Sequence, residues 1–254
     1  MKTRMFKKAL HSILWILSMI VIFVSLGFSV KQTHQLRCAD VKVDIADSAS
    51  QHFIENSDIR QWVRRNYQGI FGLPLQSVNL RKIEDGLRKL HAIEEVNVYT
   101  NVYEDGAKSC GSLVIRIKQR EPVFRVVGSS GAFYMDKLGK VIEWSPRYTP
   151  RVMIVGGLVT PEFARKKLLP LINYINDNKF LSAQIDQIYV NAVGELSMVP
   201  RVGEQIILFG SPEDYQIKFR NLKALYTDGF KDGGWSIYKS INLEFHNQIV
   251  CTKK

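Results

Sequence analysis

The longest apolar segment of the chain lies close to its amino terminus. Between Leu10 and Val30, only His11, one glycine and scattered serines interrupt the hydrophobic side chains. At about 1.5 Å per residue, about twenty such residues span a hydrocarbon core of roughly 30 Å. The pattern therefore predicts a transmembrane helix over residues 10–30. A cleavable signal peptide is the alternative, but its apolar region would be about 7–15 residues long, and no convincing cleavage site follows.

The charges before this segment predict its orientation. Residues 1–9 contain Lys2, Arg4, Lys7 and Lys8 and no acidic residue. By the positive-inside rule, such a tail stays in the cytoplasm. No second apolar run of this length follows, so we expect a single-pass protein whose residues 31–38 form a stalk and whose later residues lie outside the cytoplasm.

The pattern over residues 39–119 predicts a small β-α-α-β-β domain. Ser57 and Asn79 are the expected N-caps of its two helices, and residues 104–112 are expected to form a loop. Alternation or helical spacing of apolar side chains indicates the elements. They are a strand at 41–45, helices at 58–67 and after Asn79, and strands at 96–103 and 113–119.

A proline marks the end of this first pattern. The segment Lys118 to Phe124, KQREPVF, follows an alternating run and is followed at once by another. Proline cannot donate a hydrogen bond to a strand ladder, so the first sheet should end at Pro122. This predicts two domains joined directly, covering residues 39–119 and 120–254 and held at a nearly fixed angle.

The second domain is predicted to be β-rich with two helices, so the fold class is α+β with an N-terminal transmembrane helix. Gly139 is expected to adopt a positive φ, and Pro170 to kink the first helix. The expected strands are at 123–127, 132–135, 140–144, 184–190, 194–199, 204–210 and along Tyr238 to Cys251, with helices from Pro161 to 178 and after Ser211-Pro212.

The net charge of +11 first indicates an anionic partner such as nucleic acid. Six of the basic residues precede Asp40, the first acidic residue, so the rest of the chain carries only +5. Acidic residues are mixed with the basic ones throughout that part, and no basic stripe alternates with stacking aromatics. We therefore expect no nucleic-acid partner.

No motif for catalysis or metal binding was found. The chain lacks HExxH, GxSxG, GxGxxG and the P-loop pattern. Its five histidines are scattered, and Cys38, Cys110 and Cys251 have no metal-ligand spacing. We expect no enzyme activity, no cofactor and no catalytic or metal-binding residues.

The layout resembles the bacterial cell-division family FtsQ/DivIB over nearly the whole chain. In that family the junction between the two domains often reads Glu-Arg-x-Pro. Here it is Gln119-Arg120-Glu121-Pro122, so Arg120 and Pro122 match and the first glutamate does not. The family's Asp-x-x-Gly turn matches Asp136 and Gly139. The order of these motifs, more than any single one, carries the resemblance.

The end of the chain is similar to the family's last strand. In Ile241 to Phe245, Asn242 and Glu244 replace the usual aspartate and arginine. The resemblance implies that this strand is the edge along which the chain binds its partner, and Phe245 is the best single candidate. Because Glu244 reverses the usual charge, a basic partner residue is expected opposite it. The expected partner-binding residues are Glu244, Phe245, His246, Asn247, Gln248 and Ile249, whereas Ile241 and Leu243 are expected in the core.

The resemblance also implies a function. Residues 39–119 would be a POTRA domain and residues 120–254 the β domain of a non-enzymatic scaffold in the inner (plasma) membrane. Its expected partners are FtsB/DivIC-like and FtsL-like single-span coiled-coil division proteins. Two alternatives are another membrane-anchored POTRA protein in polypeptide transport and an extracytoplasmic cell-wall enzyme.

Overall fold

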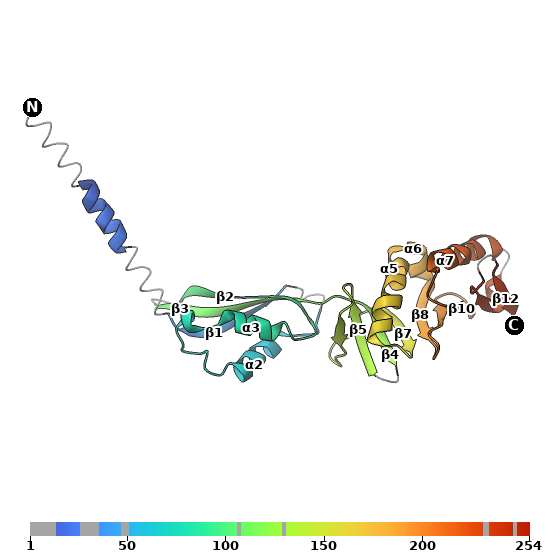
Figure 1. Cartoon of the computed structure of the whole chain (residues 1–254), viewed down its shortest axis with the longest axis horizontal. Helices are drawn as coiled ribbons and strands as arrows, with labels where there is room; N and C mark the ends of the chain where they lie inside the picture. Colours follow the sequence, from blue (N-terminus) through green and yellow to red (C-terminus); the bar gives the residue numbers. More distant parts are fainter. Residues whose placement is uncertain are drawn as a thin grey trace, which may run out of the picture. The chain divides into compact units, whose positions relative to one another are not determined.

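A computed structural model describes residues 14–25, 36–46, 51–105, 108–128, 131–230, 234–245 and 248–254. The chain divides into two compact units (Figure 1). The first comprises residues up to 46, 54–90 and 95–118, and the second comprises residues 47–53, 91–94 and 119–254. Residues 51–53 and 91–94, which fall within the predicted first domain, therefore belong to the second unit.

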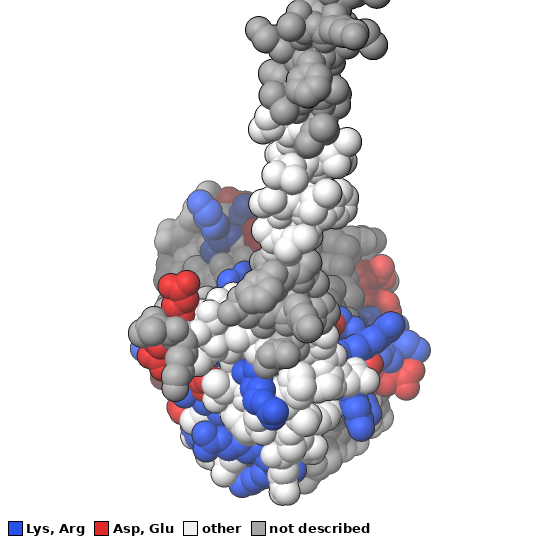
Figure 2. Space-filling model, turned by 90° about the vertical axis from the view of Figure 1, so that its left-hand side faces the viewer, with Lys and Arg blue, Asp and Glu red and all other residues white. Residues whose placement is uncertain are grey.

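Residues 14–25 are helical, and their large apolar side chains are exposed. Figure 2 shows this stretch as a surface without any Lys, Arg, Asp or Glu. Within the described residues, no helix is both long and apolar enough to cross a membrane. The other parts of the predicted span, 10–13 and 26–30, lie outside the described residues, as do the predicted tail and residues 31–35.

The first unit is a mixed α/β layer with the predicted β-α-α-β-β order. Strand β3 lies between β1 and β2, and β1 runs parallel to it. Helices α2 and α3 each bury two apolar side chains four residues apart, which is the spacing of one helix face. The elements are β1 (Cys38–Ile45), α2 (Asn56–Asn66), the 3₁₀ turn η1 (Leu75–Ser77), α3 (Leu80–Leu87), β2 (Ile93–Asp105) and β3 (Lys108–Gln119).

Two local predictions in this unit were wrong. Helix α2 begins at Asn56, so Ser57 is not its cap; instead the Glu55 N–H donates to Asp58 Oδ2 at 3.1 Å. The predicted loop 104–112 is mostly strand. Gly111 was taken as a loop residue, but packing requires it, because a Cβ there would lie 2.6 Å from Leu75 Cδ1. The Asn79 cap was confirmed, since Asn79 Oδ1 accepts from the Lys82 N–H at 3.0 Å.

The second unit is built on one mixed sheet. The order of its strands is β12-β11-β10-β9-β8-β7-β4-β5-β6. Strands β4, β7 and β8 run parallel to one another, and so do β10 and β11. The strands are β4 (Pro122–Gly128), β5 (Gly131–Asp136), β6 (Val141–Glu143), β7 (Met153–Gly157), β8 (Ile185–Val190), β9 (Leu196–Pro200), β10 (Ile206–Gly210), β11 (Tyr238–Asn242) and β12 (Val250–Lys253).

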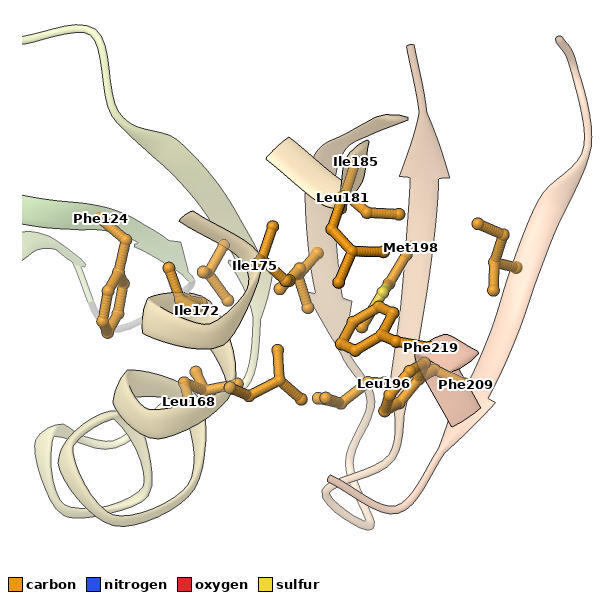
Figure 3. Close-up of a cluster of buried hydrophobic side chains, with 14 of the residues drawn as sticks. Phe124, Leu168, Ile172, Ile175, Leu181, Ile185, Leu196, Met198, Phe209 and Phe219 are labelled. Carbon is orange, nitrogen blue, oxygen red and sulfur yellow. The ribbon is translucent and has the colours of Figure 1, made fainter. Parts of the chain in front are cut away.

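Helices cover one side of this sheet and enclose its core (Figures 1 and 3). Figure 3 shows Ile172 and Ile175 of α5 and Phe219 of α7 directed toward side chains of the strands, including Met198. The helical segments are α4 (Pro161–Phe163), the π-helical segment η2 (Ala164–Leu168), α5 (Leu169–Asp177), α6 (Lys179–Gln184), α7 (Tyr215–Ala224), the π-helical segment η3 (Leu225–Gly229) and α8 (Gly234–Ile237).

The distortion expected at Pro170 is a π-helical turn. The Leu169 N–H donates to the carbonyl of Ala164, five residues earlier, in the turn that precedes the proline. Proline lacks the N–H of a regular helix and its ring crowds the preceding turn.

The predicted helix start at Ser211-Pro212 was wrong. Helix α7 begins at Tyr215, after Asp214 in the left-handed conformation (φ 52°). The short helices α6 and α8 were not predicted.

Candidate partner-binding edge

The last residues form two strands rather than one. Strand β11 ends at Asn242 and β12 begins at Val250, antiparallel to it, so the prediction of one strand from Tyr238 to Cys251 was wrong. Asn242 Oδ1 accepts a hydrogen bond from the Glu244 N–H at 2.8 Å. This local asparagine turn competes with continued strand pairing and ends β11.

Strand β12 is the terminal strand of the sheet as far as the chain is described. The Lys254 N–H donates to the Ile237 carbonyl at 3.0 Å, so this N–H points to the side on which β12 pairs with β11. Backbone groups of a strand alternate in direction, so those of Lys253 and Cys251 face the other side. These residues therefore present hydrogen-bonding groups along an open edge, which is where a further strand can pair.

The predicted partner-binding residues lie before this edge. Glu244, Phe245, Gln248 and Ile249 belong to the connection between β11 and β12, and His246 and Asn247 lie outside the described residues. The Phe245 side chain is 46% exposed, whereas Ile249 is partly buried against the core. Ile241 and Leu243 are buried, as expected.

Glu244 lies close to charged groups of its own chain. The neighbouring Lys218 is buried, and its Nζ donates to the carbonyls of Phe209 at 3.0 Å and Ser211 at 2.7 Å. Burial lowers the pKa of Lys218, and the nearby carboxylates of Asp214, Glu244 and Glu213 partly oppose that change. Glu244 is thus one of three carboxylates whose charge favours the protonated form of Lys218, an effect that the sequence did not indicate.

An aromatic cluster supports the β11–β12 hairpin from the core side. Tyr226 and Trp235 have ring centroids 4.6 Å apart, and Phe230 stacks on Tyr238 of β11 at 5.7 Å. Burial raises the pKa of Tyr226 to about 12. The cluster packs Tyr238 of the hairpin against aromatic side chains of the core, and the four-residue spacing of Tyr226 and Phe230 is a sequence signal for it.

The second predicted site, Arg120 and Pro122, lies where the chain changes sheet. Arg120 Nη1 donates to Asp136 Oδ2 at 2.6 Å, and its Nε donates to the His91 carbonyl at 3.1 Å. Pro122 is the first residue of β4 and lies opposite Asp136 in the register with β5. The arginine therefore joins residues 91–94 to the start of the β4–β5 hairpin.

Asp136 also organises the turn that follows it. Its Oδ1 accepts from the N–H groups of Leu138 at 2.9 Å and Lys140 at 2.7 Å. Gly139 has the predicted positive φ, 73°. The Arg120, Asp136 and Gly139 positions, noticed separately in the sequence, thus form one hydrogen-bonded unit.

Titratable side chains do not gather into a metal site in the described part of the chain, where no three His, Cys, Asp or Glu residues are placed to hold an ion. The described cysteines are all free thiols. Burial raises the pKa of the Cys251 thiol in β12.

The comparisons with known families agree with this geometry. A POTRA-like domain matches residues 36–105, which contain β1, α2, α3 and β2, whereas β3 of the same sheet follows the matched range. The FtsQ/DivIB, C-terminal related family matches residues 121–252, more than half of the chain. The chain therefore belongs to the FtsQ/DivIB family. No curated protein sequence matches it significantly.

Family membership implies a role in cell division, and it confirms the resemblance noted in the sequence. The α+β fold, with a POTRA-like and a β-rich part, is confirmed as well.

Proposed function

We propose that this chain is a non-enzymatic scaffold of the bacterial division complex that links membrane and extracytoplasmic division proteins during septum formation. In this proposal residues 39–119 act as the POTRA domain and residues 120–254 as the β domain. The partners are FtsB/DivIC-like and FtsL-like single-span proteins with coiled-coil segments.

The open edge of β12 is the observation that carries the proposal. An incoming strand would pair with the outward backbone groups of Cys251 and Lys253, because strand addition satisfies donors and acceptors on both chains. Phe245, which is 46% exposed, would add apolar contact beside that edge. Glu244 would meet a basic partner residue in competition with Lys218.

Residues 10–30 would anchor the scaffold in the inner membrane with the N-terminus in the cytoplasm. The exposed apolar side chains of residues 14–25 support this, since a helix that is apolar all round needs an apolar environment. The four basic residues of the tail support the orientation.

Depletion of the protein in its host tests the function. Cells should grow as filaments without septa, and expression of the wild-type chain should restore division. Normal septation at full depletion would contradict a division role.

A substitution at Phe245 tests the partner site in the same cells. Phe245→Lys should fail to restore division and should bind the FtsB/DivIC-like protein more weakly, with an unchanged circular dichroism spectrum. Val193→Lys is the matched control, because Val193 is another exposed apolar residue, in the turn between β8 and β9. Equal binding by both variants would exclude Phe245 from the site.

A further inference from the structure

A second surface of the β domain has the features of a binding groove. It has a volume of about 790 Å³ and lies where β4, β7 and β8 begin and β9 ends. This volume is within the range of about 300–1,000 Å³ that is usual for ligand sites. In the sheet, β10 and β11 separate these strands from β12, so the groove is distinct from the proposed strand-pairing edge.

The groove is strongly cationic. Arg125, Lys137, Arg151 and Arg201 line it, against a single carboxylate, that of Glu121. A concave surface lined by one sign of charge raises the local concentration of oppositely charged ligands.

Two of these cations already face carboxylates of the chain. Arg201 Nη1 lies 3.4 Å from Asp186 Oδ1, and Lys137 Nζ lies 4.0 Å from Glu94 Oε1. Arg125 and Arg151, in contrast, form no ion pair with any carboxylate in the described residues.

Arg125 is held in place while part of it remains unpaired. Its guanidinium lies over the ring of the buried Tyr134, at 5.7 Å from the centroid. Its Nε is buried and has no hydrogen-bond partner among the described residues. Leaving a buried donor unpaired costs free energy. A guanidinium binds carboxylates through two parallel hydrogen bonds, and stacking on a ring fixes its plane.

The remaining lining matches a peptide better than a small anion. The apolar side chains of Val123, Val152 and Ile154 lie beside the arginines. Asn173 and Asn176 contribute amide groups that can both donate to and accept from a peptide backbone. Sites for single-stranded nucleic acid typically stack the bases on aromatic side chains, and no Phe, Tyr, Trp or His lines the groove.

We infer that this groove binds an extended acidic segment of a partner protein, in which carboxylates alternate with apolar side chains. The carboxylates pair with Arg125 and Arg151, and the apolar side chains contact Val123, Val152 and Ile154. This is a second partner site, and it does not depend on strand pairing at β12.

Binding of a labelled peptide to the full chain in non-ionic detergent tests the inference. The probe is a short fluorescent peptide in which glutamate and valine alternate, and the control peptide has glutamine in place of glutamate. Fluorescence anisotropy should show binding of the acidic peptide only. Arg151→Gln and Arg125→Gln should each weaken it by about tenfold or more, because each removes a charge-assisted hydrogen bond. Arg220→Gln, at an exposed arginine on α7, should leave it unchanged.

Two further measurements distinguish the groove from the β12 edge and from a simple anion site. Lys253→Pro blocks the open edge of β12, and it should not change peptide binding even where it abolishes binding of the coiled-coil partner. Inorganic phosphate, added at the concentration of a matched chloride control, should not displace the peptide.

Three results would overturn the inference. They are equal affinity of wild type and Arg151→Gln, equal binding of the two peptides, and displacement of the acidic peptide by phosphate. Circular dichroism identifies any variant that fails to fold. Arg151 is exposed in the loop before β7, so its substitution gives a result even if Arg125→Gln unfolds.

Discussion

Asp136 is the residue on which the start of the β domain most depends. Its side chain is 3% exposed, and it accepts hydrogen bonds from Arg120 and from two backbone N–H groups of the following turn. Removing one partner of a buried ion pair destabilises the fold by more than the intact pair stabilises it, because the remaining charge is left buried and unpaired.

Removal of this carboxylate should therefore be costly. Asp136→Ala should lower the free energy of unfolding by about 3–5 kcal/mol, measured by urea unfolding with tryptophan fluorescence. Glu162→Ala is the control, because Glu162 pairs with Lys166 at 2.7 Å on an exposed surface. It should change the free energy of unfolding by less than about 1 kcal/mol. Equal effects at the two sites would contradict the structural role of Asp136.

The sequence predicted the members of this unit but not their contact. Arg120 and Pro122 were noted as a junction, and Asp136 and Gly139 as a turn, from residue types and from the resemblance to the family. The ion pair depends on the register that places Pro122 opposite Asp136. That pairing of residues across the two strands cannot be predicted from a single sequence without aligned relatives. The same limit applies to Lys218, whose carbonyl partners belong to the end of β10 and the residue after it.

Tyr226 should make stability depend on alkaline pH. Its pKa is about 12 in the folded chain and 10.0 ordinarily, so the unfolded chain loses this proton first as the pH rises. The folded state therefore loses stability from about pH 10 to about pH 12, by up to roughly 2–3 kcal/mol. Tyr226→Phe should remove this loss in urea unfolding at several pH values. Tyr189→Phe, at an exposed tyrosine, should retain it. A loss unchanged in Tyr226→Phe would contradict this assignment.

At the scale of elements, β11 and β12 show a limit of predicting strands from the alternation of apolar residues. Apolar residues alternate from Tyr238 to Cys251, and no glycine or proline marks a turn there. Alternation alone therefore predicted one strand. The asparagine turn at Asn242 was the signal for the break, but asparagine also occurs within strands. Strands β8, β9 and β10, separated by turns with positive-φ glycines at Gly194 and Gly203, were predicted well, whereas β7 was not predicted as a strand.

Proline substitutions in β12 should distinguish its two edges. Lys253→Pro removes an outward N–H and should abolish binding of the FtsB/DivIC-like protein while the fold is kept, because proline is tolerated on a free edge. Thr252→Pro removes a group directed toward β11 and should destabilise the hairpin. Pull-down and circular dichroism on both variants measure the difference. Full binding by Lys253→Pro would rule out strand pairing at β12.

At the scale of the whole molecule, the proposal requires a membrane anchor. Ile20→Arg places a charge at the middle of the predicted span, at a cost of about 2.5–3.5 kcal/mol for insertion, and should reduce the fraction of chain that stays with membranes after an alkaline carbonate wash. Ile20→Leu should leave that fraction unchanged. Recovery of a mature protein that begins between Lys31 and Cys38 would contradict the anchor and indicate a cleaved signal peptide.

Hydrogen exchange at the end of the chain tests the central claim most directly. The full chain in detergent is compared with and without a saturating amount of the FtsB/DivIC-like protein, and amide exchange is followed by mass spectrometry. If a partner strand pairs with β12, exchange over residues 250–254 should slow strongly on binding, because the outward amides of Cys251 and Lys253 gain hydrogen bonds. Unchanged exchange at residues 250–254, with protection elsewhere, would contradict the account.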